Sequence, residues 1–310
     1  MTAEPPAPNH DRRAELLALA GELRPELHRY CARLMGSVID GEDVVQDTLE
    51  RAFVALQELD ETPPLRPWLF RIAHNRALDL LRGQTVRLTQ PIEAASNVVD
   101  PANPDPVEML MRQEAVKTAV SRFVELPTAQ RSVVILKDVL GESLLEIAAL
   151  LDLTADAVKG HLARGRARLR EINAQAGALA EPRPASAAVA RYVALFNQRD
   201  WDGLRALLAD DVKLIQSAHP VRVGRADVGM FFTIYADHAK SGGVWLAPAW
   251  LEGREVIAVF ADSTDPKPGY IMWLEWRDGR ISFIRDYRYV RYVIADAELV
   301  LAPNTIRPSR

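Results

Sequence analysis

Cysteine and long apolar runs are both scarce in this 310-residue chain. Cys31 is the only cysteine, which excludes a disulfide within one chain and a cysteine-rich metal site and fits a reducing compartment. We expect this side chain to be buried in a core. No run of about 20 apolar residues exists, and the N-terminal MTAEPPAPNHDRR lacks the apolar segment of a signal peptide. The sequence therefore predicts a cytoplasmic protein with no membrane contact.

A large excess of one charge is also absent. The formal net charge is −4, which does not fit a protein that coats DNA without sequence preference. A basic segment in such a chain has to act locally, or with a partner that supplies most of the phosphate contacts. The length predicts two or three domains, and an apolar content of 48% is enough to bury more than one core.

The most informative segment is FVELPTAQRSVVILKDVLGESLLEIAALLDLTADAVKGHLARGRARLRE, residues 123–171. Ser143 and Glu146 have the spacing of a capping box, which predicts the start of a helix. Thr154 is placed to cap a second helix, and Asp152 falls at the left-handed position of the turn between the two. This is the order of elements in a helix-turn-helix, whose second helix enters the major groove of DNA.

The second helix of this pair has one apolar face and one basic face. Its apolar stripe consists of Val158, Leu162, Leu169 and Ile172. Between residues 154 and 172, five Lys or Arg stand against two acidic residues, whereas an ordinary solvated helix mixes its signs. Residues near the start of such a helix contact base edges, and later ones contact phosphates. The candidate DNA-binding residues are Thr154, Lys159, His161, Arg164, Arg166 and Arg168, of which Lys159 and His161 are the candidate base readers.

The N-terminal block predicts a helix with an acidic face. The segment GEDVVQDTLERAFVAL follows an expected N-cap at Asp40. Its apolar stripe consists of Val44, Val45, Leu49, Phe53 and Leu56. Asp43, Asp47 and Glu50 lie near one another on the other face, where they are either solvated or bind a basic partner surface.

A second helix of this block follows a loop that contains prolines, DETPPLRP. The sequence WLFRIAHNRALDLLR gives it a packing face of Trp68, Leu69, Ile72, Ala73, Leu80 and Leu81. The residues expected to face outward are Arg71, Asn75, Arg76, Asp79 and Arg82. Asn and Arg on one helix beside a loop suit the binding of splayed, single-stranded bases.

The composition changes twice along the chain. The segment GQTVRLTQPIEAASNVVDPANPDPVE is rich in Pro, Asn and Asp and indicates a linker, and QAGALAEPRPAS indicates a second one. Beyond it, two helical segments, AAVARYVALFNQRD and WDGLRALLAD, precede VKLIQS, the helix-like VGMFFTIYADHA and four strand-like runs. These runs are VWLAPAWLEG, EVIAVFAD, GYIMWLEWRDG and ISFIRDYRYVRYVI. Helices followed by an antiparallel set of strands predict an α+β domain.

GEDVVQDTLERAF, RPWLFRIAHNRALDLLR and the helix-turn-helix segment stand in the order found in bacterial sigma factors. Roughly the first 175 residues resemble the extracytoplasmic-function group, which has regions 2 and 4 only. The resemblance implies two all-α domains in a dissociable promoter-recognition subunit, with core RNA polymerase and promoter DNA as partners, no cofactor and no metal. It implies that the chain is not an enzyme.

The resemblance also implies roles for individual residues. It assigns core polymerase binding to Asp43, Asp47 and Glu50, and reading of the minus-ten element to Arg71, Asn75, Arg76 and Arg82. The helix from Thr154 becomes the reader of the minus-thirty-five element, although Gly160 and His161 replace the more usual Ser and Arg. The first linker resembles the segment that threads the active-site channel of the polymerase. Its acids, Glu93, Asp100 and Asp105, either mimic template charge there or belong to a simple tether.

The C-terminal third resembles SnoaL-like domains of the nuclear-transport-factor and ketosteroid-isomerase superfamily, through its element order and RYVALFNQRDWDGLRALLADDVKLI. That fold is a conical α+β barrel with a pocket, and its ligand here is unknown. Candidate pocket residues are Trp201, Phe231, Tyr235, Trp245, Trp250, Trp273, Trp276 and Tyr287, which are more often core than ligand site. Acid–base candidates are Asp211, His219, His238 and Asp286, with no pair at a spacing that predicts a proton relay.

The expected organisation and the competing functions follow from these resemblances. The expected boundaries are a flexible N-terminus 1–13, region 2 at 14–84, a linker 85–107, region 4 at 108–174, a linker 175–186, the SnoaL-like domain 187–304 and a tail 305–310. In fused factors of this kind the extra domain is expected to regulate, through intramolecular contact with regions 2 and 4. The alternatives are a ligand-responsive helix-turn-helix repressor and an enzyme that acts through the C-terminal pocket. A repressor needs neither the acidic helix nor the WLFRIAHNRALDLLR segment.

Overall fold

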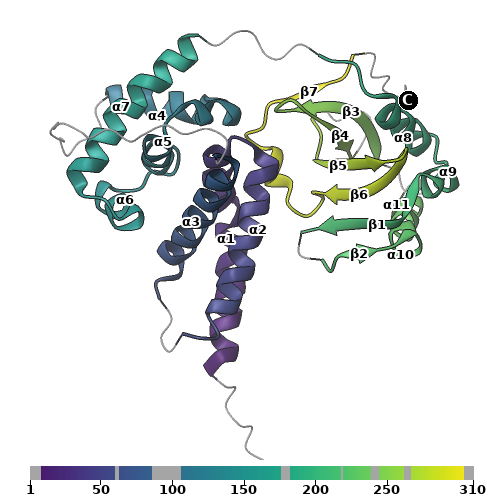
Figure 1. Cartoon of the computed structure of the whole chain (residues 1–310), viewed down its shortest axis with the longest axis horizontal. Coiled ribbons are helices and arrows are strands. Elements are labelled where there is room, and N and C mark those ends of the chain that lie inside the picture. The colour runs from purple at the N-terminus through teal and green to yellow at the C-terminus, as the bar shows by residue number, and fades with distance from the viewer. Residues whose placement is uncertain are drawn as a thin grey trace, which may run out of the picture. The chain divides into compact units, whose positions relative to one another are not determined.

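The computed structural model describes residues 8–59, 63–85, 106–175, 182–217, 219–238, 244–261 and 267–303. The chain splits into two compact units, Met1–Gly177 and Ala178–Arg310 (Figure 1). The first is helical, and the second combines helices with a sheet. This agrees with the predicted order of all-α regions followed by an α+β domain.

The first unit begins with a bundle of α1 (Pro8–Met35), α2 (Val38–Ala55) and α3 (Leu65–Thr85). Gly41 lets α2 approach α1 closely, since a Cβ there would stand 2.5 Å from the backbone of Ala32. The expected N-cap at Asp40 is wrong. Ser37 caps α2, because its extended backbone (φ −152°, ψ 128°) lets its side chain accept the Asp40 backbone N–H. Asp40 instead lies in the first turn, where its negative charge stabilises the helix through the helix dipole.

A second group of helices completes the first unit. It consists of α4 (Pro106–Lys117), the 3₁₀-helix η1 (Val120–Glu125), α5 (Thr128–Val134), the π-helical turn η2 (Ile135–Val139), α6 (Leu144–Leu151) and α7 (Ala155–Ala174). The predicted helix-turn-helix is confirmed as α6 and α7. Gly165 lets α7 pack closely on α5, since a Cβ there would stand 2.6 Å from Cγ2 of Val134.

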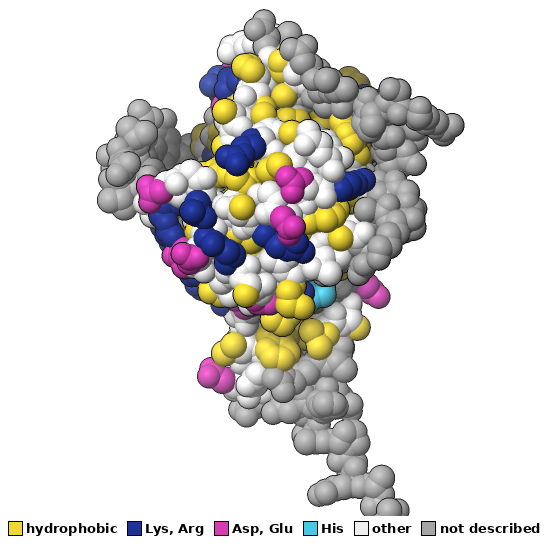
Figure 2. Space-filling view, turned by 90° about the vertical axis from the view of Figure 1, so that its right-hand side faces the viewer, with side chains coloured by type: hydrophobic (Ala, Val, Ile, Leu, Met, Phe, Trp, Pro, Cys, Tyr) yellow, Lys and Arg dark blue, Asp and Glu magenta, His cyan; other side chains and the backbone are white. Residues whose placement is uncertain are grey.

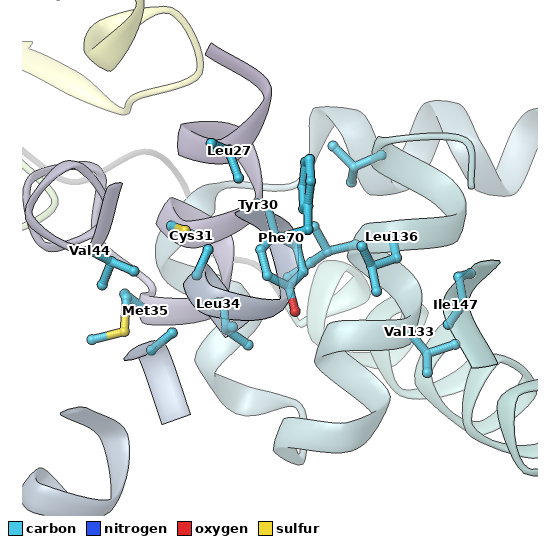
Figure 3. Packing of buried hydrophobic residues seen from close by; sticks show 14 of the residues in the cluster. Leu27, Tyr30, Cys31, Leu34, Met35, Val44, Phe70, Val133, Leu136 and Ile147 are labelled. Carbon is cyan, nitrogen blue, oxygen red and sulfur yellow. The ribbon is translucent and has the colours of Figure 1, made fainter. Parts of the chain in front are cut away.

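The two helical groups of the first unit share one hydrophobic core. A single cluster of buried residues extends from Leu16 in α1 to Ile172 in α7. Figure 3 shows Tyr30 and Phe70 of the bundle beside Leu136, which follows α5. Cys31 is fully buried here, as predicted, and burial raises the pKa of its thiol. Because the core is continuous, the two groups pack as one body.

The second unit is a seven-stranded sheet with helices on one side (Figure 1). Its helices are α8 (Ala187–Asn197), α9 (Trp201–Ala206), α10 (Arg225–Gly229) and α11 (Phe231–His238). The strands are β1 (Leu208–Gln216), β2 (Arg222–Val223), β3 (Trp245–Leu251), β4 (Arg254–Phe260), β5 (Tyr270–Arg277), β6 (Arg280–Asp286) and β7 (Leu299–Leu301). Basic and acidic side chains are interspersed on the side of the molecule shown in Figure 2, as is usual for a solvated surface.

The predicted antiparallel set of four strands is confirmed as β3 to β6, but the sheet as a whole is mixed. Strands β3 to β6 form an antiparallel meander, but β1 pairs with β6 in parallel. The chain passes through α10 and α11 between β2 and β3, and no local pattern reveals the direction in which β6 then meets β1. β1 also begins at Leu208, where a helix was predicted to continue, and β2 and β7 were not predicted. The last long strand ends at Asp286 and is followed by the 3₁₀-helix η4 (Arg291–Ile294).

Alternate residues of the strands build the core of the second unit. The strand residues in this cluster include Leu246, Ile257, Val259, Met272 and Leu274. They pack on apolar side chains of the helices, which include Val193, Phe196, Phe231 and Phe232. Because side chains alternate along a strand, the residues next to these, such as Trp245 on β3 and Trp273 on β5, face the other side of the sheet.

Candidate functional site

Local hydrogen bonds fix the helix-turn-helix. The Ser143 side chain accepts the Glu146 backbone N–H at 3.2 Å, and the Glu146 carboxylate accepts the Ser143 N–H at 2.8 Å, which completes the predicted capping box. Thr154 accepts the Ala157 N–H at 3.1 Å and caps α7, as predicted. Asp152 between the helices is left-handed (φ 56°, ψ 48°), again as predicted. These bonds set the direction in which α7 leaves the turn.

The outward side of α7 carries most of the predicted DNA-binding residues. Arg168 and Arg170 are exposed, and Arg168 donates to Glu171 at 2.9 Å. Lys159 is half-buried and lies 3.9 Å from the Asp156 carboxylate. Exposed pairs of this kind contribute little to stability, so their charges remain available to a phosphate.

His161 and Arg164 interact with each other on this helix. Both side chains are half-buried, and the Arg164 guanidinium lies 3.4 Å from Nδ1 of His161. Burial, and next to it the charge of Arg164, lowers the pKa of His161 below its ordinary value. The imidazole is therefore neutral at neutral pH.

Arg166 departs from the predicted outward face. Its side chain is only 13% exposed, and its guanidinium donates to both carboxylate oxygens of the fully buried Asp138, at 2.9 and 2.6 Å. Asp138 belongs to η2, a segment 28 residues earlier in the chain. The outward placement of Arg166 was wrong because a buried carboxylate needs a well-aligned cation. Contact of Arg166 with DNA stays a prediction.

The acidic face of α2 is partly engaged within the bundle. Asp43 and Glu50 are exposed, and Glu50 accepts from Gln46 at 2.8 Å. Asp47 accepts from Arg76 at 2.6 and 2.8 Å. The structure thus joins in one ion pair a residue predicted for polymerase binding and one predicted for the minus-ten element.

The other residues predicted for the minus-ten element lie along α3. Asn75 and Arg82 are exposed on this helix. Arg71 is exposed too, and its guanidinium donates to the backbone oxygen of Ala149 on α6 at 2.9 Å. The helix expected to read the minus-ten element is therefore bonded to the first helix of the helix-turn-helix.

Polar contacts also fasten the bundle of α1–α3 to the helices α4–α7, and we call this set the joint. Arg66 of α3 forms an ion pair across the joint with Glu142 at 2.5 Å, and a second one within the bundle with Glu26 at 2.7 Å. Arg131 of α5 is buried and donates to the backbone oxygen of Leu34 at 2.6 Å. Burial lowers the pKa of Arg131 to about 10. Sequence reasoning missed the joint, since each bond spans tens of residues.

Among the acid–base candidates whose side chains are described, Asp286 alone lies in the interior of the second unit. Its side chain accepts from Nε2 of Gln216 and from the backbone N–H of Arg288, both at 2.9 Å. Burial raises the pKa of this carboxyl group to about 6, although both hydrogen bonds act against the rise.

Three tyrosines that come from two helices and one strand interact electrostatically with this carboxyl group. The hydroxyls of Tyr235 and Tyr270 lie 2.6 Å apart. The buried hydroxyl of Tyr192 has no hydrogen-bond partner among the described residues. Burial and then the charge of Asp286 raise the pKa of all three. Sequence reasoning named neither Tyr192 nor Tyr270, because the two share an apolar pattern with the core.

Two of the other acid–base candidates are exposed, whereas Asp286 is buried. Asp211 is exposed and forms an ion pair with Arg277. The His219 ring lies 4.2 Å from that of Tyr289. The side chain of His238 is outside the described residues. Asp211 and His219 therefore do not converge with Asp286 on one site.

The predicted pocket aromatics divide between the two faces of the sheet. Phe231 and Tyr235 belong to the core between sheet and helices, with Trp201 and Trp276 packed against it. Trp245 packs on Phe260 and Trp273 on Phe283, on the opposite face. Tyr287 is buried beside Arg285, just beyond β6, and Nε1 of Trp250 donates to the backbone oxygen of Arg183. The set does not surround one space.

The described residues contain no candidate metal cluster and no membrane-spanning helix, and the linker acids lie outside them. Among the side chains that the structure describes, no three His, Cys, Asp or Glu gather where a metal ion could be held. No helix in the described ranges is long and apolar enough to cross a bilayer. The linker acids Glu93, Asp100 and Asp105 fall outside those ranges.

Comparison with known families finds three matches along the chain. The model described as Sigma-70 region 2 matches residues 19–87, that of Sigma-70 region 4 matches residues 114–169, and that of the SnoaL-like domain matches residues 189–284. All three lie in the order that the sequence predicted.

Two sigma factors and one solved structure are similar to parts of this chain. The ECF RNA polymerase sigma factor SigG of Mycobacterium tuberculosis is 33% identical over 64% of this chain, which spans only 60% of that protein's length. The RNA polymerase sigma factor CnrH of Cupriavidus metallidurans is 38% identical over 43% of this chain and 73% of its own. Among solved structures, the extracytoplasmic function sigma factor SigJ of Mycobacterium tuberculosis is 20% identical, with a TM-score of 0.34, over 93% of this chain and 99% of its own.

Proposed function

Because the chain belongs to the extracytoplasmic-function group of sigma-70 family sigma factors, with regions 2 and 4 followed by a SnoaL-like domain, we propose that it binds core RNA polymerase and directs initiation at specific promoters. The observation that carries the proposal is the capped pair α6 and α7, whose outward side is basic in a chain of net charge −4. Such a helix needs a partner that supplies the remaining phosphate contacts, and a polymerase is such a partner.

The proposed division of labour follows the exposed residues. The face of α2 with Asp43, Asp47 and Glu50 binds a basic surface of the polymerase, to which three neighbouring carboxylates are complementary. The outward residues of α3, Asn75 foremost, capture unstacked bases of the minus-ten element. The outward residues of α7 read the minus-thirty-five element in the major groove.

Run-off transcription tests this proposal. The full chain is mixed with purified core polymerase and fragmented genomic DNA, and the transcripts are sequenced. We expect discrete start sites whose upstream DNA shares two short elements, one near minus ten and one near minus thirty-five. Core polymerase without the chain is the control. A transcript pattern identical to that control would overturn the proposal.

We further infer that the SnoaL-like domain regulates transcription. The support is its interior polar cluster, in which Asp286 is buried and the Tyr192 hydroxyl lacks a partner among the described residues. Such groups are costly in a domain that serves only as a spacer. The test compares the full chain with one that ends at residue 178, a cut between the two compact units. A change of transcript yield in either direction supports regulation, and identical yields from the cognate promoter would contradict it.

A further inference from the structure

His161 and Arg164 lie on one strip of α7. With Arg168 they recur at the spacing i, i+3 and i+7, which aligns side chains on a helix. The strip begins at His161, in the second turn of α7 after the Thr154 cap. Residues in this part of a recognition helix are the ones that reach base edges. His161 is thus placed to meet DNA bases, with Arg164 directly behind it.

The contact between the two side chains fixes the proton of the imidazole. A guanidinium can only donate hydrogen bonds, so Nδ1 of His161, 3.4 Å from Nη2 of Arg164, is the acceptor. In a neutral imidazole the proton is then on Nε2, at the far end of the ring. The charge of Arg164 and the partial burial of the ring both oppose a second proton. His161 therefore offers DNA one uncharged N–H donor.

An uncharged donor has a defined complement in the major groove. Guanine presents O6 and N7 there, adenine presents N7 and thymine presents O4, all of which are acceptors, whereas cytosine presents only its amino donor. We propose that His161 is a specificity-determining residue of the minus-thirty-five helix, which rejects cytosine at one base position through its Nε2–H, and that Arg164 is the positioning residue that holds this tautomer. This inference rests on the proposed function and deepens it.

The proposal separates His161 from the cations around it. A lysine or arginine that binds phosphate releases counterions, and its loss reduces the salt dependence of binding. A neutral imidazole releases none. The loss of His161 should therefore alter sequence preference and leave salt dependence unchanged.

Selection from a DNA library tests the proposal with the full chain bound to core polymerase. The library is randomised across the minus-thirty-five region, and the chains compared are wild type, His161→Ala, Arg164→Ala and Arg164→Lys. We expect wild type to disfavour cytosine at one position by about fivefold, the ratio that one net hydrogen bond of about 1 kcal/mol gives. His161→Ala and Arg164→Ala should lose this preference. Arg164→Lys should keep it, since an ammonium group also only donates.

Nitrogen-15 spectra of the histidines in the same chains give a second measurement. Wild type and Arg164→Lys should show His161 protonated on Nε2, and Arg164→Ala should show a mixture of tautomers. A proton on Nδ1 in wild type would overturn the proposal, as would an unchanged base preference in His161→Ala. An even loss across all sequences in Arg164→Ala would reduce Arg164 to a phosphate contact. If wild type with polymerase enriches no sequence at all, the proposed function itself fails.

Discussion

Replacing Arg166 separates a packing role from a DNA-binding role on the same helix. The Asp138 carboxylate is fully buried, and Arg166 supplies two hydrogen bonds to it. Removal of one partner from a buried ion pair leaves an uncompensated charge and costs about 3–5 kcal/mol. Arg166→Ala should therefore lose a large part of a stability that is about 5–15 kcal/mol in ordinary domains. The exposed pair of Arg168 with Glu171 contributes at most about 0.5 kcal/mol, so Arg168→Ala is the matched control.

A double variant carries the decisive comparison. Asp138→Leu with Arg166→Met removes both charges and replaces them with apolar groups, an exchange that is often neutral or stabilising. Urea unfolding followed by far-ultraviolet circular dichroism should show Arg166→Ala strongly destabilised and the double variant close to wild type. Each phosphate contact that is lost lowers the slope of log affinity against log salt by about 0.9. With holoenzyme on promoter DNA, Arg168→Ala should show this lower slope and the double variant should not.

Two results would refute this reasoning. An unchanged urea midpoint for Arg166→Ala would mean that the buried carboxylate does not depend on its partner. A stable double variant with a salt slope reduced by about 0.9 would mean that Arg166 contacts phosphate after all, as the charge pattern of the helix first indicated.

Other parts of the chain give three further predictions. Asp47→Arg places a second guanidinium group beside Arg76 and removes one of the three neighbouring acids of α2, so less core polymerase should be retained in a pull-down. Asp79→Arg, at an exposed position of α3, is the control and should retain as much polymerase as wild type. Burial raises the pKa of Asp286 from 3.8 to about 6, so its stabilising contribution is full below pH about 4 and is lost as the pH rises through about 6, a change of about 3 kcal/mol. Urea unfolding followed by tryptophan fluorescence should show this fall in wild type, and Asp286→Asn should flatten it; a flat wild-type profile would contradict the assignment. Arg66→Ala removes the ion pair with Glu142 that crosses the joint, so the buried amides on both sides of it should exchange with deuterium about fivefold faster, the ratio for about 1 kcal/mol. Unchanged exchange there would show that this pair does not hold the joint.

Signals that act within one turn of helix were sufficient to predict much of the first unit. The capping box of Ser143 and Glu146, the Thr154 cap and the left-handed Asp152 involve residues at most three positions apart. The same reasoning misplaced the cap of α2, because both Ser37 and Asp40 are good cap residues and only the backbone of Ser37 is extended. A local pattern cannot rank two adequate caps.

Contacts between segments that are distant in the chain could not be predicted from local sequence patterns. In the sequence, Arg166 could not be told apart from the other arginines of the basic face. Its partner Asp138 lies 28 residues earlier, on a π-helical turn that no sequence pattern predicts. The parallel pairing of β1 with β6 likewise depends on the path of the chain through two intervening helices. The cluster around Asp286 needs side chains from α8, α11, β1 and β5, and of these four the sequence singled out only Tyr235 of α11. Such sites exist only after the fold has formed.

Under the proposed function, the shared core of the first unit adds a free-energy cost to promoter recognition, because the two helical groups have to separate. Elements centred near minus ten and minus thirty-five lie roughly 85 Å apart along B-DNA at about 3.4 Å per base pair. Even α1, with its 28 residues, spans only about 42 Å, so one packed body cannot place α3 and α7 on both elements at once. A chain that reads both elements is then in a separated form, and each ~1.4 kcal/mol needed to separate the regions weakens the apparent affinity of the holoenzyme for the promoter tenfold. Buried residues such as Arg131 and Leu136 thereby affect how readily the chain reads a promoter in the absence of any signal.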